Sequence, residues 1–170
     1  ENGNAAELGH ITIAWDGRQC NCGNRGCLEA YASGTGLAKR AQELVRDGQL
    51  PVLLELAGSV ENITAETVVS AVRQGDAEAK RLWDETMEIL GAGIASVINT
   101  FNPSRIVLGG GLTKAGDPLF EPVRKTALAR AMPPLAEIVD IVPAELGDAV
   151  GVVGAAAVAF ERLQDKEHGR

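Results

Sequence analysis

The clearest pattern in the sequence is a run of apolar and small residues that repeats every 3.6 positions between Asp76 and Asn102. Asp76 is a typical N-cap, and Asn102-Pro103 ends the pattern because the residue before a proline avoids the helical conformation. The spacing predicts a long amphipathic helix whose inner face consists of Leu82, Thr86, Ile89, Leu90, Gly93, Ile94, Val97, Ile98 and Phe101.

Two glycines, Gly91 and Gly93, lie inside this predicted helix. Each costs about 1 kcal/mol in helix propensity relative to alanine. We therefore expect another element to pack very close to the helix at these two positions.

Shorter periodic segments predict the remaining elements. We expect Thr64 and Asp148 to be N-caps, and Asp117 to be an N-cap followed by Pro118 at the first helical position. The predicted helices cover about 28–47, 52–57, 65–73, 117–132 and 148–163, and the predicted strands cover 10–15, 105–108 and 138–142.

The second half thus alternates helix, strand, helix, strand, helix. By the right-handed crossover rule, this order gives parallel strands with helices packed on the sheet. The predicted class is α/β. We expect one domain over residues 1–163, because no repeat or linker interrupts it, followed by a polar tail over 164–170.

Charge and composition exclude several classes of protein. The formal net charge is −7, and no cluster of Lys and Arg exceeds two adjacent residues, so we expect no nucleic acid to bind this segment. No apolar run approaches the ~18–20 residues that cross a bilayer. The start of the chain lacks an initiator Met and a signal-peptide pattern, so we expect a cytoplasmic location and a fragment of a longer protein.

All three cysteines lie within eight residues, at Cys20, Cys22 and Cys27, and His10 precedes them. Three thiolates and one imidazole are a standard tetrahedral ligand set for Zn²⁺, and with all four positions filled by protein the metal would be structural. The alternative is three reduced cysteines packed as small hydrophobic residues, with a histidine at the surface. The spacing favours zinc.

Two carboxylates flank the proposed metal loop, since Glu7 precedes His10 and Glu29 follows Cys27. A metal fixes the neighbouring backbone, and carboxylates accept hydrogen bonds from sugar hydroxyls, to which the free imidazole nitrogen of His10 could also donate. The alternative, that both are solvated glutamates, is equally supported by these residues alone.

The predicted strand over 105–108 runs directly into Gly109, Gly110 and Gly111. Backbone amides at the carboxyl end of a parallel strand can approach a phosphate or a nucleobase closely. Three glycines after a strand can also be a simple turn, and no P-loop or dinucleotide-binding motif is present.

Taken together, these residues resemble the ROK family of bacterial sugar kinases and repressors. Glu7-Leu8-Gly9-His10, nine further residues and then Cys20-Asn21-Cys22-Gly23-Asn24-Arg25-Gly26-Cys27-Leu28-Glu29 match the family's first signature. The segment from Asn102 to Gly111 is similar to the family's NPxxIVLGGG segment, and 145–157 resembles its closing segment. The resemblance covers essentially all 170 residues, as the carboxy-terminal half to two-thirds of a family member.

The resemblance implies an actin-like, ribonuclease-H-like α/β fold, of which this chain would be mostly the larger carboxy-terminal domain. It implies that Glu7, His10 and Glu29 bind a hexose, and that His10 with the three cysteines binds Zn²⁺. The glycines would border the nucleotide, ATP with Mg²⁺. Gly3 and Asn4, which precede the signature, would line the sugar pocket.

In the family's kinases, the general base is an aspartate of an Asn-Asp motif, and a glycine-rich phosphate loop lies near the amino terminus; both would precede this segment. Without them, we predict that the 170 residues alone are catalytically inactive.

The resemblance leaves two ligand-binding functions. The first is an ATP-dependent hexose kinase, most simply a glucokinase acting on the 6-hydroxyl of glucose, with polyphosphate as another donor in some relatives. The second is the sugar-binding effector domain of a repressor whose DNA-binding helix-turn-helix lies upstream. A zinc-stabilised module without ligand is the third option, and we expect a homo-oligomer.

Overall fold

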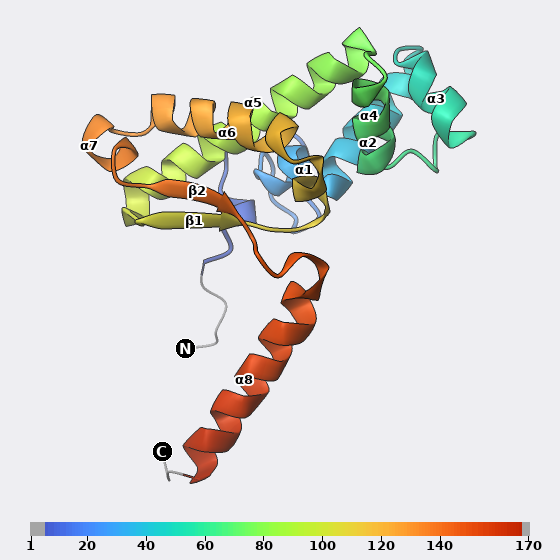
Figure 1. The fold of residues 1–170 in the computed structure, drawn as a ribbon. Coiled ribbons are helices and arrows are strands. Elements are labelled where there is room, and N and C mark those ends of the chain that lie inside the picture. The colour runs from blue at the N-terminus through green and yellow to red at the C-terminus, as the bar shows by residue number, and fades with distance from the viewer. Residues whose placement is uncertain (1–5, 168–170) are drawn as a thin grey trace.

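The computed structural model describes residues 6–167 and contains a small parallel sheet at one side of the molecule (Figure 1). Strands β1 (Arg105–Leu108) and β2 (Asp140–Pro143) pair in parallel, with Arg105 opposite Asp140 and Leu108 opposite Pro143. Helices lie on one side of this sheet, and the predicted α/β class is confirmed.

The helices follow the predicted order with two additions. They are α1 (Glu29–Ala32), α2 (Gly34–Arg46), α3 (Pro51–Ala57), α4 (Ala65–Arg73), α5 (Ala77–Phe101), α6 (Asp117–Arg130), α7 (Pro133–Ala136) and α8 (Val150–Glu167). Short 3₁₀ turns are η1 (Leu8–His10), η2 (Gly111–Ala115) and η3 (Gly147–Ala149).

The long helix α5 organises the core, because it packs against α1, α4 and α6. Its N-cap is Asp76, which accepts a hydrogen bond from the Ala79 N–H at 2.7 Å, as predicted. The indole N–H of Trp83 donates to the carbonyl of Pro118 at 3.0 Å and joins α5 to α6. Arg124 of α6 donates to the carbonyl of Ile141 at 2.8 Å and joins α6 to the sheet.

The two glycines of α5 lie where neighbouring elements come closest, which confirms the prediction. A Cβ built on Gly91 would lie 2.6 Å from the Cβ of Thr126, and one built on Gly93 would lie 2.5 Å from the Cδ2 of Leu28. Any larger side chain would collide with α6 or with the residue that precedes α1.

The amino-terminal part departs from the prediction at two places. The prediction of a strand over 10–15 is wrong. Leu8–His10 forms η1, and within 10–15 the one β-type pairing is an isolated bridge from Thr12 to Cys27. The helix predicted over 28–47 breaks at Ser33, whose backbone is extended and whose hydroxyl accepts the Gly36 N–H at 2.9 Å. An N-cap serine thus starts a new helix in the middle of a continuous apolar pattern.

Prolines and glycines move the boundaries in the second half. The N-cap of α6 is Gly116, so the prediction that Asp117 caps this helix is wrong; Asp117 is its first residue. The helix ends at Arg130 rather than 132, because Met132 precedes a proline and is extended. The second strand covers 140–143 rather than 138–142.

Helix α8 projects away from the rest of the molecule (Figure 1). It extends through Glu167, so residues 164–167, predicted as a frayed tail, continue the helix. Its valines and Phe160 are exposed, with Val152 at 77% and Phe160 at 67%. The predicted capping side chain of Asp148 lies outside the described residues. Within residues 6–167, no helix is both long and apolar enough to span a bilayer.

Candidate functional site

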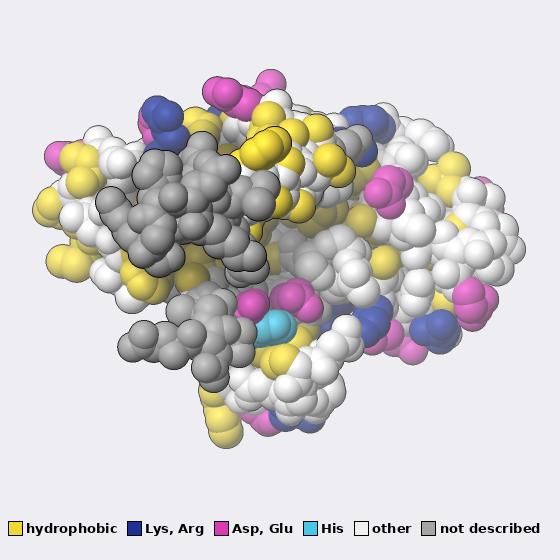
Figure 2. All heavy atoms as spheres, turned by 90° about the horizontal axis from the view of Figure 1, so that it is seen from below, with side chains coloured by type: hydrophobic (Ala, Val, Ile, Leu, Met, Phe, Trp, Pro, Cys, Tyr) yellow, Lys and Arg dark blue, Asp and Glu magenta, His cyan; other side chains and the backbone are white. Residues whose placement is uncertain are grey.

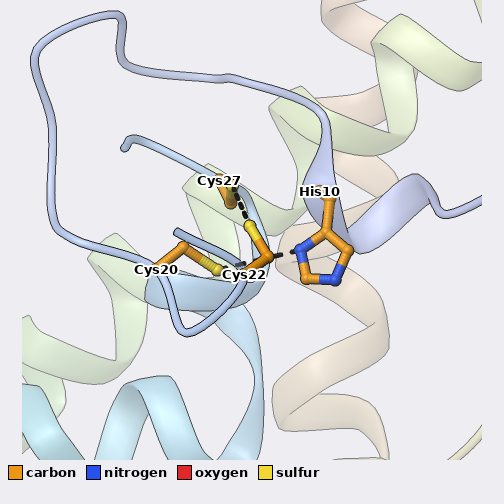
Figure 3. Close-up of side chains that lie close together, drawn as sticks. All are labelled: His10, Cys20, Cys22 and Cys27. Carbon is orange, nitrogen blue, oxygen red and sulfur yellow. Dashed lines mark hydrogen bonds between the residues drawn. The ribbon is translucent and has the colours of Figure 1, made fainter. Parts of the chain in front are cut away.

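The four predicted metal ligands come together in one cluster. Their ligand atoms all lie within 4.8 Å of one another, and the side chains of His10, Cys20, Cys22 and Cys27 point toward a common centre (Figure 3). The Nδ1 of His10 lies 3.7 Å from the Sγ of Cys20, and the Sγ atoms of Cys22 and Cys27 are also 3.7 Å apart.

These spacings fit a tetrahedral zinc site. With Zn–S bonds of about 2.3 Å and Zn–N bonds of about 2.0–2.1 Å, neighbouring ligand atoms are roughly 3.5–3.8 Å apart. The two 3.7 Å separations correspond to edges of such a tetrahedron. The donor set and its spacing therefore suit Zn²⁺, with no ligand position left for substrate.

Glycines make the segment over 10–27, the candidate metal loop and called the metal loop below, fold this tightly. Gly26 has a positive φ of 73°, and a Cβ there would lie 1.6 Å from the carbonyl oxygen of Ala14. The Gly26 carbonyl accepts the Ile13 N–H at 2.8 Å, and the Gly26 N–H donates to the Arg18 carbonyl at 2.7 Å. The two arms of the loop are thereby joined immediately before Cys27.

The protonation of the thiols differs with their surroundings. Burial raises the pKa of Cys27 to about 11, whereas a backbone hydrogen bond at Asn24, followed by a hydrogen bond with Cys20, lowers the pKa of Cys22. A divalent metal would favour the thiolate at all three cysteines, because metal ligation requires deprotonation.

The face of His10 opposite the cysteines carries Glu29, one of the sugar-binding candidates. The Nε2 of His10 lies 3.9 Å from the Oε2 of Glu29, with the two side chains 31% and 43% exposed. Glu29 is the first residue of α1, and Glu7 precedes η1 and is exposed. Viewed from below, the histidine side chain reaches the surface with acidic side chains beside it (Figure 2).

The two nitrogens of the His10 imidazole therefore face different groups. Nδ1 faces the sulfur atoms and Nε2 faces the carboxylate, so ligation through Nδ1 leaves Nε2–H as a donor. A polyhydroxylated ligand could accept from Nε2 and donate to the Glu29 carboxylate. Gly3 and Asn4, the other sugar-pocket candidates, lie outside the described residues.

The predicted nucleotide-binding glycines border a cavity of about 710 Å³. Gly109, Gly110 and Gly111 form one wall, and Gly110 has a positive φ of 99°. The opposite walls come from the starts of α2 and α4, with Ser33, Thr35 and Glu66 among their residues. Hydrogen bonds from its own backbone N–H and from the Thr64 hydroxyl hold the pKa of Glu66 below its usual value.

Sequence reasoning missed the residues that α2 and α4 contribute to this cavity. The run Ser33-Gly34-Thr35-Gly36 was the available signal, since small polar residues at a helix start leave the backbone accessible. The cavity and the sugar-binding candidates are also close along the chain. The Ser33 N–H donates to the carbonyl of Glu29 at 3.3 Å, so Ser33 of the cavity and the sugar-binding candidate Glu29 lie on successive turns of the chain.

The sequence of this chain is similar to those of known proteins. The sequence is 36% identical to the glucokinase of Thermotoga maritima over 162 residues, which is 95% of this chain and 51% of the relative. It is 31% identical to the N-acetylglucosamine repressor of Shigella flexneri over 157 residues, which is 92% of this chain and 37% of the repressor.

Among solved structures, a ROK family glucokinase from Streptomyces griseus, in complex with glucose and AMPPNP, superposes with a TM-score of 0.78 at 37% identity. The match covers 91% of this chain and 51% of that one. The chain thus spans about half the length of the curated glucokinases it matches.

The fold and these likenesses define the class: a sugar-kinase-like α/β domain of the actin-like ATPase fold. Within that class the chain belongs to the ROK family, whose family model matches residues 1–162. The chain corresponds to a carboxy-terminal portion of its glucokinase relatives.

Proposed function

We propose that this chain is the sugar-binding, nucleotide-bordering portion of an ATP-dependent hexose kinase that transfers phosphate to the 6-hydroxyl of glucose. The observation that carries the proposal is the position of Glu29 beside the free face of His10, on the turn that leads to the glycine-walled cavity. The likeness to glucokinases, including one in complex with glucose and AMPPNP, supports it.

On the sugar side, Glu29 and Glu7 would accept hydrogen bonds from ring hydroxyls, and Nε2–H of His10 would donate one. Zn²⁺, held by His10, Cys20, Cys22 and Cys27, would supply rigidity rather than Lewis-acid chemistry, because the protein fills all four ligand positions. A rigid loop would hold Glu29 in one orientation toward the sugar.

On the nucleotide side, the backbone at Gly109, Gly110 and Gly111 would border ATP, which would bind with Mg²⁺ in the 710 Å³ cavity. The depressed pKa of Glu66 keeps its carboxylate ionised, so it can accept hydrogen bonds from ribose hydroxyls. Ser33 lines this cavity and its N–H donates to the carbonyl of Glu29, so the two proposed ligand sites would be one helical turn apart along the chain.

Phosphoryl transfer also needs a base at the sugar hydroxyl and donors around the phosphates. We propose that these groups belong to the part of the protein that matches the other half of the glucokinase relatives, and that residues 1–170 alone do not turn over. Assembly as a homo-oligomer remains a prediction.

A second function has its own support in the likeness to the N-acetylglucosamine repressor. In that case, the same His10–Glu29 face would bind a sugar as an effector, and no phosphate would be transferred. The kinase is the better-supported function because the glucokinase relatives are the more similar and match a larger share of their own length.

The decisive experiment is ADP release by the protein expressed from its complete gene, with ATP, Mg²⁺ and a panel of hexoses. Turnover that is fastest on glucose supports the proposal and ranks the sugars. Sugar binding without turnover, with zinc present, would move the protein to the repressor class. Turnover by residues 1–170 alone would contradict the assignment of the base to another part of the protein.

A further inference from the structure

One face of α2 is turned toward the metal loop and contacts it at two points. Lys39 donates from Nζ to the Oδ1 of Asn21 at 3.1 Å, and Asn21 lies between two of the metal ligands. One turn further on, Glu43 accepts a hydrogen bond from Arg18 at 2.7 Å. Between them, Arg40 faces Tyr31 rather than the loop itself.

Tyr31 connects the loop to the helix that carries Glu29. Its hydroxyl accepts the backbone N–H of Arg18 at 2.8 Å. It lies so close to the loop that a Cβ on Gly17 would be 2.3 Å from the hydroxyl oxygen. Because Tyr31 is two residues after Glu29 on α1, a shift of the tyrosine ring would move the sugar-binding carboxylate and the loop together.

Arg40 fixes the ring of Tyr31 from the other side. Its guanidinium lies 5.9 Å from the ring centroid, and the residue is only 7% exposed. One guanidinium nitrogen donates to the hydroxyl of Thr86 at 2.9 Å, and the other pairs with Glu85 at 2.8 Å. Both partners are on α5, so a buried cation anchored to the core supports the tyrosine.

We propose that Tyr31, supported by Arg40, is a positioning residue for sugar binding. It holds the metal loop and Glu29 in a fixed position relative to the core helix α5. The inference rests on the proposed function, because it assigns Glu29 to the sugar. It adds that affinity for the sugar depends on two residues that are not among the proposed sugar ligands. The contacts run from the loop through Tyr31 and Arg40 to α5.

The test is the Y31F variant of the protein expressed from its complete gene. This change keeps the ring and removes only the acceptor for the Arg18 N–H. Loss of one hydrogen bond that orders the loop should raise the glucose KM by about three- to tenfold. The KM for ATP, the kcat and the zinc content should stay close to the parent values. R40K keeps the positive charge but cannot donate to Thr86 and Glu85 at the same time, so it should also raise the glucose KM.

The matched control is R46Q, also on α2. Arg46 pairs with Glu61 at 3.6 Å, and both side chains are largely exposed, at 53% and 75%. This variant should leave the glucose KM unchanged. Amide exchange gives a readout independent of sugar: the Arg18 amide should exchange faster in Y31F and not in R46Q.

The outcomes separate the inference from the proposed function. A parent protein that turns over glucose, with Y31F unchanged in glucose KM, overturns the inference and leaves the function standing. A parent that neither binds nor phosphorylates a hexose overturns both. If Y31F loses zinc and thermal stability together with affinity, Tyr31 is structural and the positioning role is wrong.

Discussion

Gly93 of α5 and Leu28 are in such close contact that no side chain fits at residue 93, since a Cβ there would be 2.5 Å from the Cδ2 of Leu28. Leu28 is buried and lies between Cys27, one of the four candidate metal ligands, and the carboxylate Glu29. The core helix therefore sets the position of the junction between the metal loop and α1.

The first prediction is that G93A destabilises the protein and weakens sugar binding. Overpacking costs about 1–3 kcal/mol, and the better helix propensity of alanine offsets about 1 kcal/mol of it. A net loss of up to about 2 kcal/mol in the free energy of unfolding is expected, measured by urea denaturation. Glucose titration should show a higher Kd, because Leu28 must move.

G91A is the matched control for this variant. Its Cβ would be 2.6 Å from the Cβ of Thr126 on α6, so a similar loss of stability is expected. The glucose Kd should not change, because Thr126 is not connected to the metal loop. Equal effects of both variants on the Kd would contradict the role given to Leu28.

The second prediction concerns the charge of Glu29. E29Q keeps the shape of the side chain and should raise the sugar KM by a factor of ten or more, because a charged hydrogen bond is worth ~1.5–3 kcal/mol. Steady-state kinetics measure it. E55Q, an exposed glutamate on α3, controls for the loss of one surface carboxylate. An unaltered KM would make Glu29 an ordinary solvated glutamate.

The third prediction concerns removal of the metal. A chelator should lower the melting temperature and weaken sugar binding together, because His10 would join the metal centre to the sugar face. Calorimetry before and after chelation, with zinc added back, measures both effects. Unchanged sugar affinity in protein shown to be free of metal would count against a shared role for His10.

The fourth prediction concerns the ion pair of Arg18 and Glu43. The hydrogen bond from Arg18 lowers the pKa of Glu43 in the folded state below its ordinary value of 4.5. The stabilisation is therefore complete above pH 4.5 and is lost as the pH falls through the folded pKa. The stability of E43Q should lack this part of the pH dependence. At neutral pH, the free energy of unfolding of E43Q should be lower than that of the parent by at most about 1 kcal/mol, because Glu43 is half exposed.

Urea denaturation of E43Q and the parent between pH 3 and pH 7 measures the difference between them. The two stability curves should converge at the acid end. Parallel curves over the whole range would show that the pair contributes nothing to the pH dependence.

The parts of the fold that sequence reasoning predicted are those governed by local chemistry. Asp76 and Thr64 cap their helices as predicted, because an N-cap is decided by a side chain and the backbone three residues away. The clustering of His10 with the three cysteines was predictable, because cysteines at such short spacing have few uses other than metal binding, and the four side chains do lie together. The close approach at Gly91 and Gly93 followed from their cost to a helix.

The parts that were missed depend on distant contacts. The segment over 10–15 alternates like a strand, but its backbone bonds to the loop around Gly26, so no strand forms. Ser33 looks like one residue in a helical pattern, and only the break between α1 and α2 shows it as a cap. The contribution of Glu66 to the cavity depends on how α4 packs, which no local pattern reports.

Helix α8 has a consequence for how cooperatively the molecule unfolds. Residues 150–161 are almost all apolar or small, yet every one of them is exposed, and the contacts of α8 with other described elements are mainly with η3. A helix of this length without packing is marginal in water. We therefore expect α8 to be a separate unit of low local stability, whose amide hydrogens exchange before those of the core helix α5.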